Sequence, residues 1–153
     1  DIMTSAKALG GGGPVVAFLM TEKVGANSLK AGDHGTTYGG NPLACAAICK
    51  VLDLFEKNHI IEHVAEVSGY LEEKLDALVS KYEKIRARRG IGLMQGLVFD
   101  EPVGPVIASA LEEGLILINA GPDIIRFVPP LIIGRKEVDE MAEILERCLN
   151  RKV

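Results

Sequence analysis

The sequence has 153 residues, of which 48% are hydrophobic and 25% are charged, a composition typical of globular domains. The net charge of −4 at pH 7 argues against a nucleic-acid-binding surface, and charged residues interrupt every apolar segment before it reaches membrane-spanning length. Cys45, Cys49 and Cys148 form no disulfide framework, so we predict a cytoplasmic protein in which these thiols are small buried side chains. A metal held by Cys45 and Cys49, four residues apart on a predicted helix, is the alternative.

The first third of the chain combines short apolar segments with many glycines. Residues 15–20 predict a buried strand, and residues 27–41 predict a glycine-rich loop. Asn41 as an N-cap and Pro42 at the first helical position then predict a helix that ends near Lys57. The strand has no predicted neighbour to pair with, so we expect this region to be poorly ordered, rearranged or buried against a partner.

The rest of the chain alternates helical and strand patterns. The periodicity predicts helices over residues 60–82, 102–113 and 135–151, and strands over residues 85–88, 91–99, 115–118 and 124–128. We therefore predict two parts, in which residues 1–57 form the tail of a larger α/β layer and residues 58–153 form a small α+β domain. The basic run at residues 86–89 falls at a strand start and indicates a solvated edge rather than a phosphate-binding patch.

A lysine stands immediately before four glycines in the segment SAKALGGGGP, residues 5–14. Apolar surroundings disfavour the ammonium form of a lysine and make its amine available to attack a carbonyl carbon. Glycines beside Lys7 would let the backbone approach a flat cofactor closely. The alternative for this local pattern is a solvated lysine next to a glycine turn.

Two further segments contain groups suited to anions. In GDHGTTYGGNP, residues 32–42, the hydroxyls of Thr36 and Thr37 precede a helix N-terminus, an arrangement that suits a phosphate or a carboxylate. In IIRFVPP, residues 124–130, Arg126 lies within an apolar strand pattern, and its planar guanidinium suits a carboxylate. A structural ion pair is the alternative role for Arg126.

These segments, together with RGIGLMQGL at residues 89–97, resemble consecutive motifs of the class III aminotransferases in their order and spacing. The resemblance covers essentially the whole chain. It implies an α/β fold of the aspartate-aminotransferase type (fold type I), in which residues 1–57 end the large cofactor-binding domain and residues 58–153 form the small C-terminal domain. It also implies dependence on pyridoxal 5'-phosphate. Within the class, the motifs are most similar to those of the acetylornithine enzymes, with ornithine-type and succinylornithine enzymes close behind.

The resemblance also implies roles for four residues. Lys7 matches the lysine that forms a Schiff base with pyridoxal 5'-phosphate and later carries the proton of the reaction. Thr37 matches the threonine that reaches the cofactor phosphate of the neighbouring subunit, and Thr36 matches a position, commonly serine, that touches the substrate across the same homodimer. Arg126 matches the arginine that meets a substrate carboxylate, that of glutamate or 2-oxoglutarate.

The reaction implied by the resemblance is amino transfer from N-acetylornithine to 2-oxoglutarate, which gives N-acetylglutamate semialdehyde and glutamate in arginine biosynthesis. Ornithine, succinylornithine and succinyldiaminopimelate stay open as alternative donors, because part of the pocket that reads the acyl group is absent from this sequence. Members of the family are much longer, so we expect this chain to be a portion of an enzyme that is incomplete alone. We expect no metal, nucleic-acid or membrane partner.

Two other interpretations compete with the aminotransferase. The run H-x-x-E-H at residues 59–63 has the spacing of a zinc-protease motif, with two histidines four residues apart on one helical face and Glu62 as the base. The other interpretation is a non-catalytic interaction module, in which residues 58–153 fold as an independent α+β domain.

Overall fold

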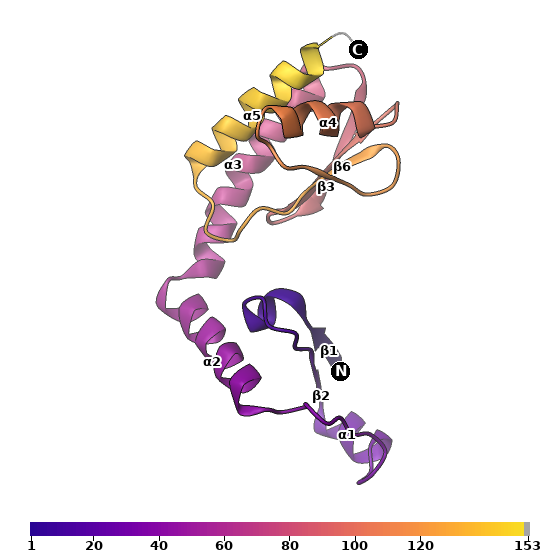
Figure 1. The fold of residues 1–153 in the computed structure, drawn as a ribbon, viewed down its shortest axis with the longest axis vertical. Coiled ribbons are helices and arrows are strands. Elements are labelled where there is room, and N and C mark those ends of the chain that lie inside the picture. The colour runs from indigo at the N-terminus through magenta and orange to yellow at the C-terminus, as the bar shows by residue number, and fades with distance from the viewer. Residues whose placement is uncertain (152–153) are drawn as a thin grey trace. The chain divides into compact units, whose positions relative to one another are not determined.

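The computed structural model describes residues 1–151, and the chain divides into two compact units, Asp1–His59 and Ile60–Val153. Figure 1 shows the helices and strands of each unit along the chain. Of the helices within the described residues, none is both long enough and apolar enough to span a membrane.

Unit 1 contains a two-stranded antiparallel sheet and three helical segments. Its elements are β1 (Ile2–Ser5), the short 3-10 helix η1 (Lys7–Gly10), β2 (Ala17–Met20), α1 (Glu22–Ser28) and α2 (Pro42–Lys57). The predicted helix after Asn41 is confirmed together with its cap. The Ala44 amide donates a hydrogen bond of 3.0 Å to Asn41 Oδ1, which satisfies one of the free donors at the start of α2.

The structure corrects two expectations for unit 1. The strand predicted within residues 15–20 has a partner after all, because β1 pairs with β2 and places Met3 opposite Leu19. β1 is only four residues long, too short for its periodicity to indicate a strand. Residues 22–28 form the helix α1, with Thr21 at the N-cap position, so the first two residues of the loop predicted over residues 27–41 are helical.

Unit 2 consists of three helices and a four-stranded antiparallel sheet. Its elements are α3 (Ile60–Lys81), β3 (Ile85–Ile91), β4 (Met94–Phe99), α4 (Gly104–Glu112), β5 (Ile118–Asn119), β6 (Ile124–Phe127) and α5 (Arg135–Asn150). The strands are arranged in the order β3-β4-β6-β5. The structure confirms the three helices predicted after residue 58 and the strands predicted over residues 85–88 and 124–128. The strand predicted over residues 91–99 is interrupted by a turn at Gly92 and Leu93, and the strand predicted over residues 115–118 overlaps β5 only at Ile118.

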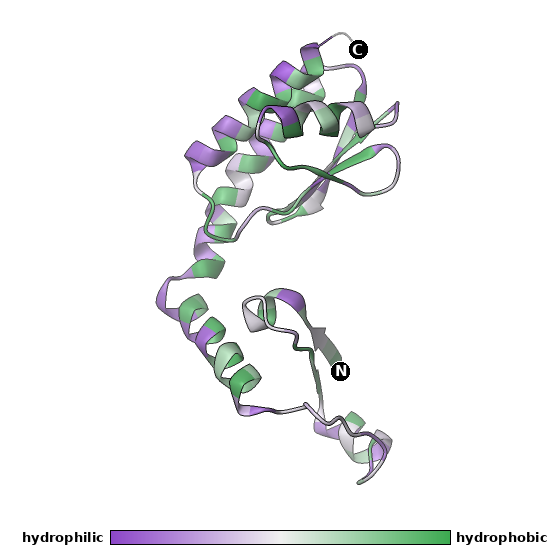
Figure 2. Ribbon diagram, in the orientation of Figure 1, coloured by the Kyte–Doolittle hydropathy of each residue, from purple (hydrophilic) through white to green (hydrophobic). Residues whose placement is uncertain are grey.

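The core of unit 2 lies between the helices and one face of the sheet. Leu75 of α3, Leu97 of β4, Ile125 of β6 and Leu145 of α5 have no exposed surface at all. Figure 2 shows hydrophilic and hydrophobic residues alternating along α5, as expected for a helix that buries one side against a core. The opposite face of the sheet, which includes Arg126, does not contribute to this core.

Candidate active site

Lys7 is the first residue of η1, and it is exposed. Its backbone φ is 56°, in the left-handed region that residues other than glycine adopt rarely and at a cost of about 1–3 kcal/mol. The surrounding turns hold this conformation, since the Leu9 amide donates to the Ala6 carbonyl at 3.2 Å and the Gly11 amide to the Ala8 carbonyl at 3.0 Å. A strained backbone at an exposed amine is typical of functional positions.

The glycines after Lys7 are required by the turn itself. A Cβ on Gly10 would stand 2.4 Å from Val15 Cγ1, which real Cβ atoms do not do. Gly11 has a φ of 60°, so a side chain there would be strained as well. These two positions explain the start of the glycine run without a ligand, and close approach to a flat cofactor stays a prediction.

The two threonines lie in an exposed loop that leads into α2. The Gly39 amide donates a hydrogen bond of 3.4 Å to the Thr36 carbonyl, and a Cβ on Gly39 would come within 2.1 Å of Thr36 Cγ2. The absence of a side chain at Gly39 therefore leaves room for the Thr36 side chain. Thr36 and Thr37 are both exposed, and Asn41, the N-cap of α2, follows four residues after Thr37.

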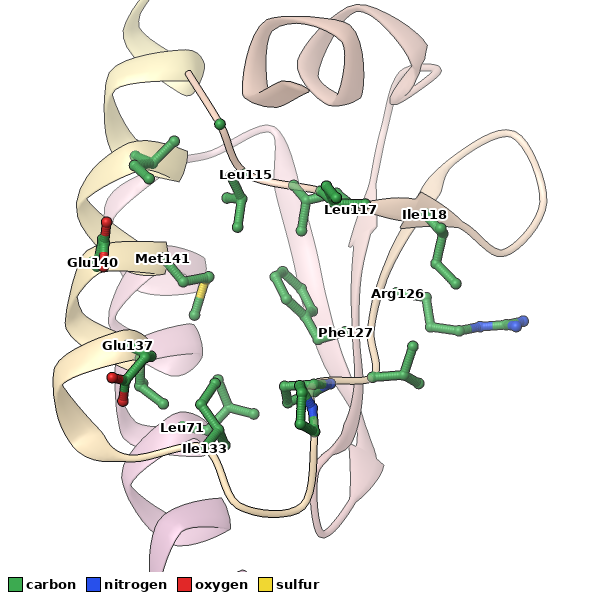
Figure 3. A pocket seen from close by; sticks show the side chains of 17 residues that line it. Leu71, Leu115, Leu117, Ile118, Arg126, Phe127, Ile133, Glu137, Glu140 and Met141 are labelled. Carbon is green, nitrogen blue, oxygen red and sulfur yellow. The ribbon is translucent and has the colours of Figure 1, made fainter. Parts of the chain in front are cut away.

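Arg126 lies on the solvent-facing side of β6. Its sequence neighbours Ile125 and Phe127 are buried, whereas Arg126 is exposed. Arg126 is one of the residues that line the pocket drawn in Figure 3, where its guanidinium extends away from Phe127.

Most arginines of this chain are engaged by carboxylates, but within residues 1–151 Arg126 is not. Five of the seven arginines form ion pairs, namely Arg86, Arg88, Arg135, Arg147 and Arg151. Within residues 1–151, Arg126 and Arg89 have no carboxylate partner. Within these residues the structural ion pair considered for Arg126 does not form, and its role toward a substrate carboxylate stays a prediction.

Arg89 is a candidate that the sequence analysis treated only as part of a solvated edge. It is exposed, and it pairs across the sheet with Gly96, which in turn pairs with Arg126. No pattern along the chain shows this arrangement, because it depends on the register of three strands. The segment RGIGLMQGL contains both Arg89 and Gly96, but the strands predicted over residues 85–88 and 91–99 left Arg89 between them.

Unit 2 also contains a pocket of about 460 Å³ between α5 and the strands β5 and β6 (Figure 3). Its lining is largely apolar and includes Leu117, Phe127 and Met141. Its acidic members are Glu137 and Glu140 of α5, and the Gly134 amide donates to Glu137 Oε2 at 3.0 Å, which caps α5. This pocket offers apolar contact rather than converging catalytic groups.

The predicted site residues belong to different units. Lys7, Thr36 and Thr37 lie in unit 1, and Arg126 lies in unit 2. Within unit 1, η1 packs against α2, the helix that follows the threonine loop, and a Cβ on Gly11 would touch Val51 Cγ2 at 3.4 Å. The same unit therefore holds the lysine and both hydroxyls.

The two metal sites considered from the sequence do not form. His59 has a φ of 49° and precedes α3, so it does not share a helical face with His63, whose Nε2 lies 2.9 Å from the Ile133 carbonyl oxygen. Cys45 and Cys49 are exposed rather than buried, which corrects the prediction for both. Among the described residues, no group of three or more His, Cys, Asp and Glu side chains could hold a metal ion.

Comparison with known proteins decides the family. The family model described as aminotransferase class III matches residues 1–149. The chain belongs to the class III aminotransferases. Two relatives in this family are the acetylornithine aminotransferase of Gloeobacter violaceus, 45% identical over 99% of this chain, and the mitochondrial acetylornithine aminotransferase of Saccharomyces cerevisiae, 45% identical over 97%. The chain spans 38% and 35% of the lengths of these two class III enzymes.

Solved structures confirm the predicted α/β fold of type I. The acetylornithine aminotransferase of Elizabethkingia anophelis superposes with a TM-score of 0.88 at 28% identity, and it matches 97% of this chain and 38% of its own. The ornithine delta-aminotransferase of Plasmodium falciparum superposes with a TM-score of 0.90 at 30% identity, and it matches 97% of this chain and 39% of its own.

Proposed function

We propose that the whole protein is a pyridoxal-phosphate-dependent aminotransferase that moves the amino group of N-acetylornithine to 2-oxoglutarate. The products are N-acetylglutamate semialdehyde and glutamate, a step of arginine biosynthesis. One observation carries the proposal: relatives named acetylornithine aminotransferase match 97–99% of this chain at 45% identity. The cytoplasmic location stays a prediction, since the relatives include mitochondrial enzymes.

The residues of unit 1 fit pyridoxal 5'-phosphate chemically. Lys7 supplies an exposed primary amine on a backbone held in an unusual conformation, and a primary amine is the group that reacts with an aldehyde. Thr37 supplies an exposed hydroxyl close in sequence to a helix N-terminus, where hydroxyl and amide donors suit a phosphate. When bound, the cofactor supplies an electron sink for the carbanion that forms as the substrate loses its Cα proton.

Each residue then has a definite task in the proposed reaction. Lys7 would hold the cofactor through Nζ, and its amine would accept and return the substrate's Cα proton. Thr37 orients the cofactor phosphate, and Thr36 contacts the substrate, both across a homodimer interface. Arg126 binds a carboxylate of glutamate or 2-oxoglutarate with its exposed guanidinium, which has no carboxylate partner within residues 1–151.

An ornithine-type donor is the second candidate. The observation that favours it is the match to the ornithine delta-aminotransferase of Plasmodium falciparum, whose TM-score of 0.90 is as high as that of the acetylornithine enzyme. The donors differ by an acyl group that removes one positive charge, so a direct comparison of their rates separates the candidates.

The test uses the full-length protein that contains this sequence. Lys7→Ala should abolish transamination and the visible absorbance band of the bound cofactor, because no other amine takes its place. Lys23→Ala, on the exposed helix α1, is the matched control and should keep both. Near wild-type turnover in Lys7→Ala would overturn the role of Lys7. A higher kcat/KM for ornithine or succinylornithine than for N-acetylornithine would overturn the choice of donor.

A further inference from the structure

The loop that carries Thr36 and Thr37 has hydrogen bonds of short range only. It contains four glycines between residues 32 and 40, and glycine leaves the backbone more conformational freedom than any other residue. Within residues 1–151, every hydrogen bond made by residues 30–41 joins positions at most four apart. Bonds of this range shape the turns of the loop, but they do not fix its position on the rest of unit 1.

One side chain of this loop contacts a strand. The ring of His34 packs on the ring of Phe18, with the two ring centroids 5.8 Å apart and the ring planes tilted by 56°. This distance and tilt are typical of favourable aromatic pairs. Phe18 belongs to β2 and pairs with Thr4 of β1, and β1 ends two residues before Lys7. The contact therefore joins the threonine loop to the strand pair that leads to the lysine.

A second contact involves the same face of β2. Met20 lies two residues after Phe18, so both side chains project from one face of the strand. Met20 Sδ accepts a hydrogen bond of 4.0 Å from Ser28 Oγ at the end of α1, and a Cβ on Gly25 would touch the same sulfur atom at 3.4 Å. The helix α1 and the loop that follows it thus both pack on β2, and the His34 contact continues this arrangement.

The two threonines lie between two fixed points of the chain. His34 comes two residues before Thr36, and Asn41, the N-cap of α2, comes four residues after Thr37. A chain advances at most about 3.6 Å per residue, so the Cα atom of Thr37 lies within about 11 Å of that of His34. Packing of the His34 ring on Phe18 therefore restricts where the threonine hydroxyls can lie.

We propose that His34 is a positioning residue, whose ring packing on Phe18 holds the loop where Thr37 meets the phosphate of pyridoxal 5'-phosphate. The inference rests on the proposed function in one respect, namely that Thr37 contacts this phosphate. In this role His34 touches neither cofactor nor substrate, and another aromatic ring at its position can replace it. Loss of the ring should lower the affinity for the phosphate-bearing cofactor and leave the amine of Lys7 unaffected.

The first test measures cofactor binding to the full-length protein that contains this sequence. His34→Ala should weaken the binding of pyridoxal 5'-phosphate about fivefold, the factor that corresponds to the loss of one aromatic pair. Pyridoxal, which has no phosphate, should bind this variant and the wild type equally. His34→Phe should keep the wild-type affinity because it keeps the ring pair, whereas His34→Gln keeps a similar size without a ring and should behave like His34→Ala.

The second test follows the loop in the absence of cofactor. Amide hydrogen exchange of residues 35–39 in the cofactor-free full-length protein should be about fivefold faster in His34→Ala than in the wild type, and His34→Phe should return it to the wild-type rate. Asn27→Ala is the matched control, because Asn27 is an exposed, uncharged residue of α1 whose amide donates within the same helix, to the Lys23 carbonyl at 2.8 Å. It should change neither the exchange nor the affinity.

Unchanged loop exchange in His34→Ala, an equal loss of affinity for pyridoxal and pyridoxal 5'-phosphate, or a His34→Phe variant that behaves like His34→Ala would each overturn the positioning role. Thr37→Ala separates this inference from the proposed function. Weaker binding of pyridoxal 5'-phosphate in Thr37→Ala but not in His34→Ala would refute the role of His34 alone. Unchanged binding in Thr37→Ala together with faster loop exchange in His34→Ala would refute the phosphate contact of Thr37, and His34 would then support the loop without serving the cofactor.

Discussion

Gln95 is the most heavily used polar side chain in the core of unit 2, and its replacement gives a quantitative test of the structure. It is only 2% exposed. Its Nε2 donates to Glu72 Oε1 at 3.1 Å and to the Gly92 carbonyl at 2.7 Å, and its Oε1 accepts from Arg88 Nη1 at 3.1 Å. These bonds tie α3 to the hairpin formed by β3 and β4. We therefore expect Gln95→Met, which keeps length and removes all three bonds, to destabilise unit 2.

The magnitude follows from the partners. The bond to the Gly92 carbonyl is neutral and contributes about 1 kcal/mol, and the two bonds to charged groups contribute about 1.5 kcal/mol each at the low end of their range. Arg88 keeps its bidentate pair with Asp76, so it is not left without a partner. The expected loss in the free energy of unfolding is about 4 kcal/mol.

Urea unfolding followed by tyrosine fluorescence measures this loss. In a Tyr38→Phe background the remaining tyrosines, Tyr70 and Tyr82, both report on unit 2. Gln95→Glu is the second variant, and it should be at least as destabilising at pH 7, because a carboxylate cannot donate to Glu72 and repels it. A loss below about 1 kcal/mol for Gln95→Met would refute the idea that this network holds the hairpin to α3.

Gly90→Ala should destabilise unit 2 by about 2 kcal/mol or more, because Gly90 has a φ of 146° and a Cβ there would lie 2.2 Å from the Met94 carbonyl oxygen. Gly69→Ala, in the middle of α3 with open space around it, should instead stabilise unit 2 by about 0.8–1 kcal/mol. Urea unfolding measures both variants, and a change in the free energy of unfolding with the same sign in both would contradict this prediction. Asp139→Asn should lower stability at neutral pH, because hydrogen bonds from Lys74 and then from Tyr70 lower the pKa of Asp139 below its ordinary 3.8. The stabilising contribution of this carboxylate is present above pH 3.8 and is lost as the pH falls through the lowered pKa. Thermal melts should therefore show the difference in melting temperature between Asp139→Asn and wild type shrinking below pH 3.8. A difference that stays constant with pH would contradict this prediction.

The sequence was most informative where local signals and burial agreed. The helix that begins at Pro42 is predicted by a capping asparagine, a proline at the first helical position and an apolar periodicity. All three are present in the structure. The strands of unit 2 were recognisable because their apolar runs end at glycines, such as Gly92 with its φ of 57°. β1 was missed because it is four residues long and depends on a partner, β2, that lies twelve residues later.

The candidate site was predictable only residue by residue. Lys7 and Arg126 are each a charged residue within an apolar segment, and this pattern can be recognised from the sequence alone. The left-handed backbone conformation of Lys7 cannot be recognised from the sequence, since no residue type encodes it. The relation between Arg89 and Arg126 is invisible for a different reason. It arises from strand register, and a shift of one residue in β3 would turn Arg89 into the core and bring Arg88 to the outer face.

The outer strands of the unit 2 sheet have a consequence for association between copies of the chain. β3 is an edge strand, and an edge strand offers free backbone donors and acceptors to any other strand. Its pairing with β4 shifts register between Ile85 and Ala87, and it carries Arg86, Arg88 and Arg89, so a second β3 would meet an irregular backbone and like charges. β5, at the opposite edge, pairs over only two residues. The sheet therefore stops at four strands, and its apolar interior strands are shielded from the edge-to-edge growth that leads to aggregates.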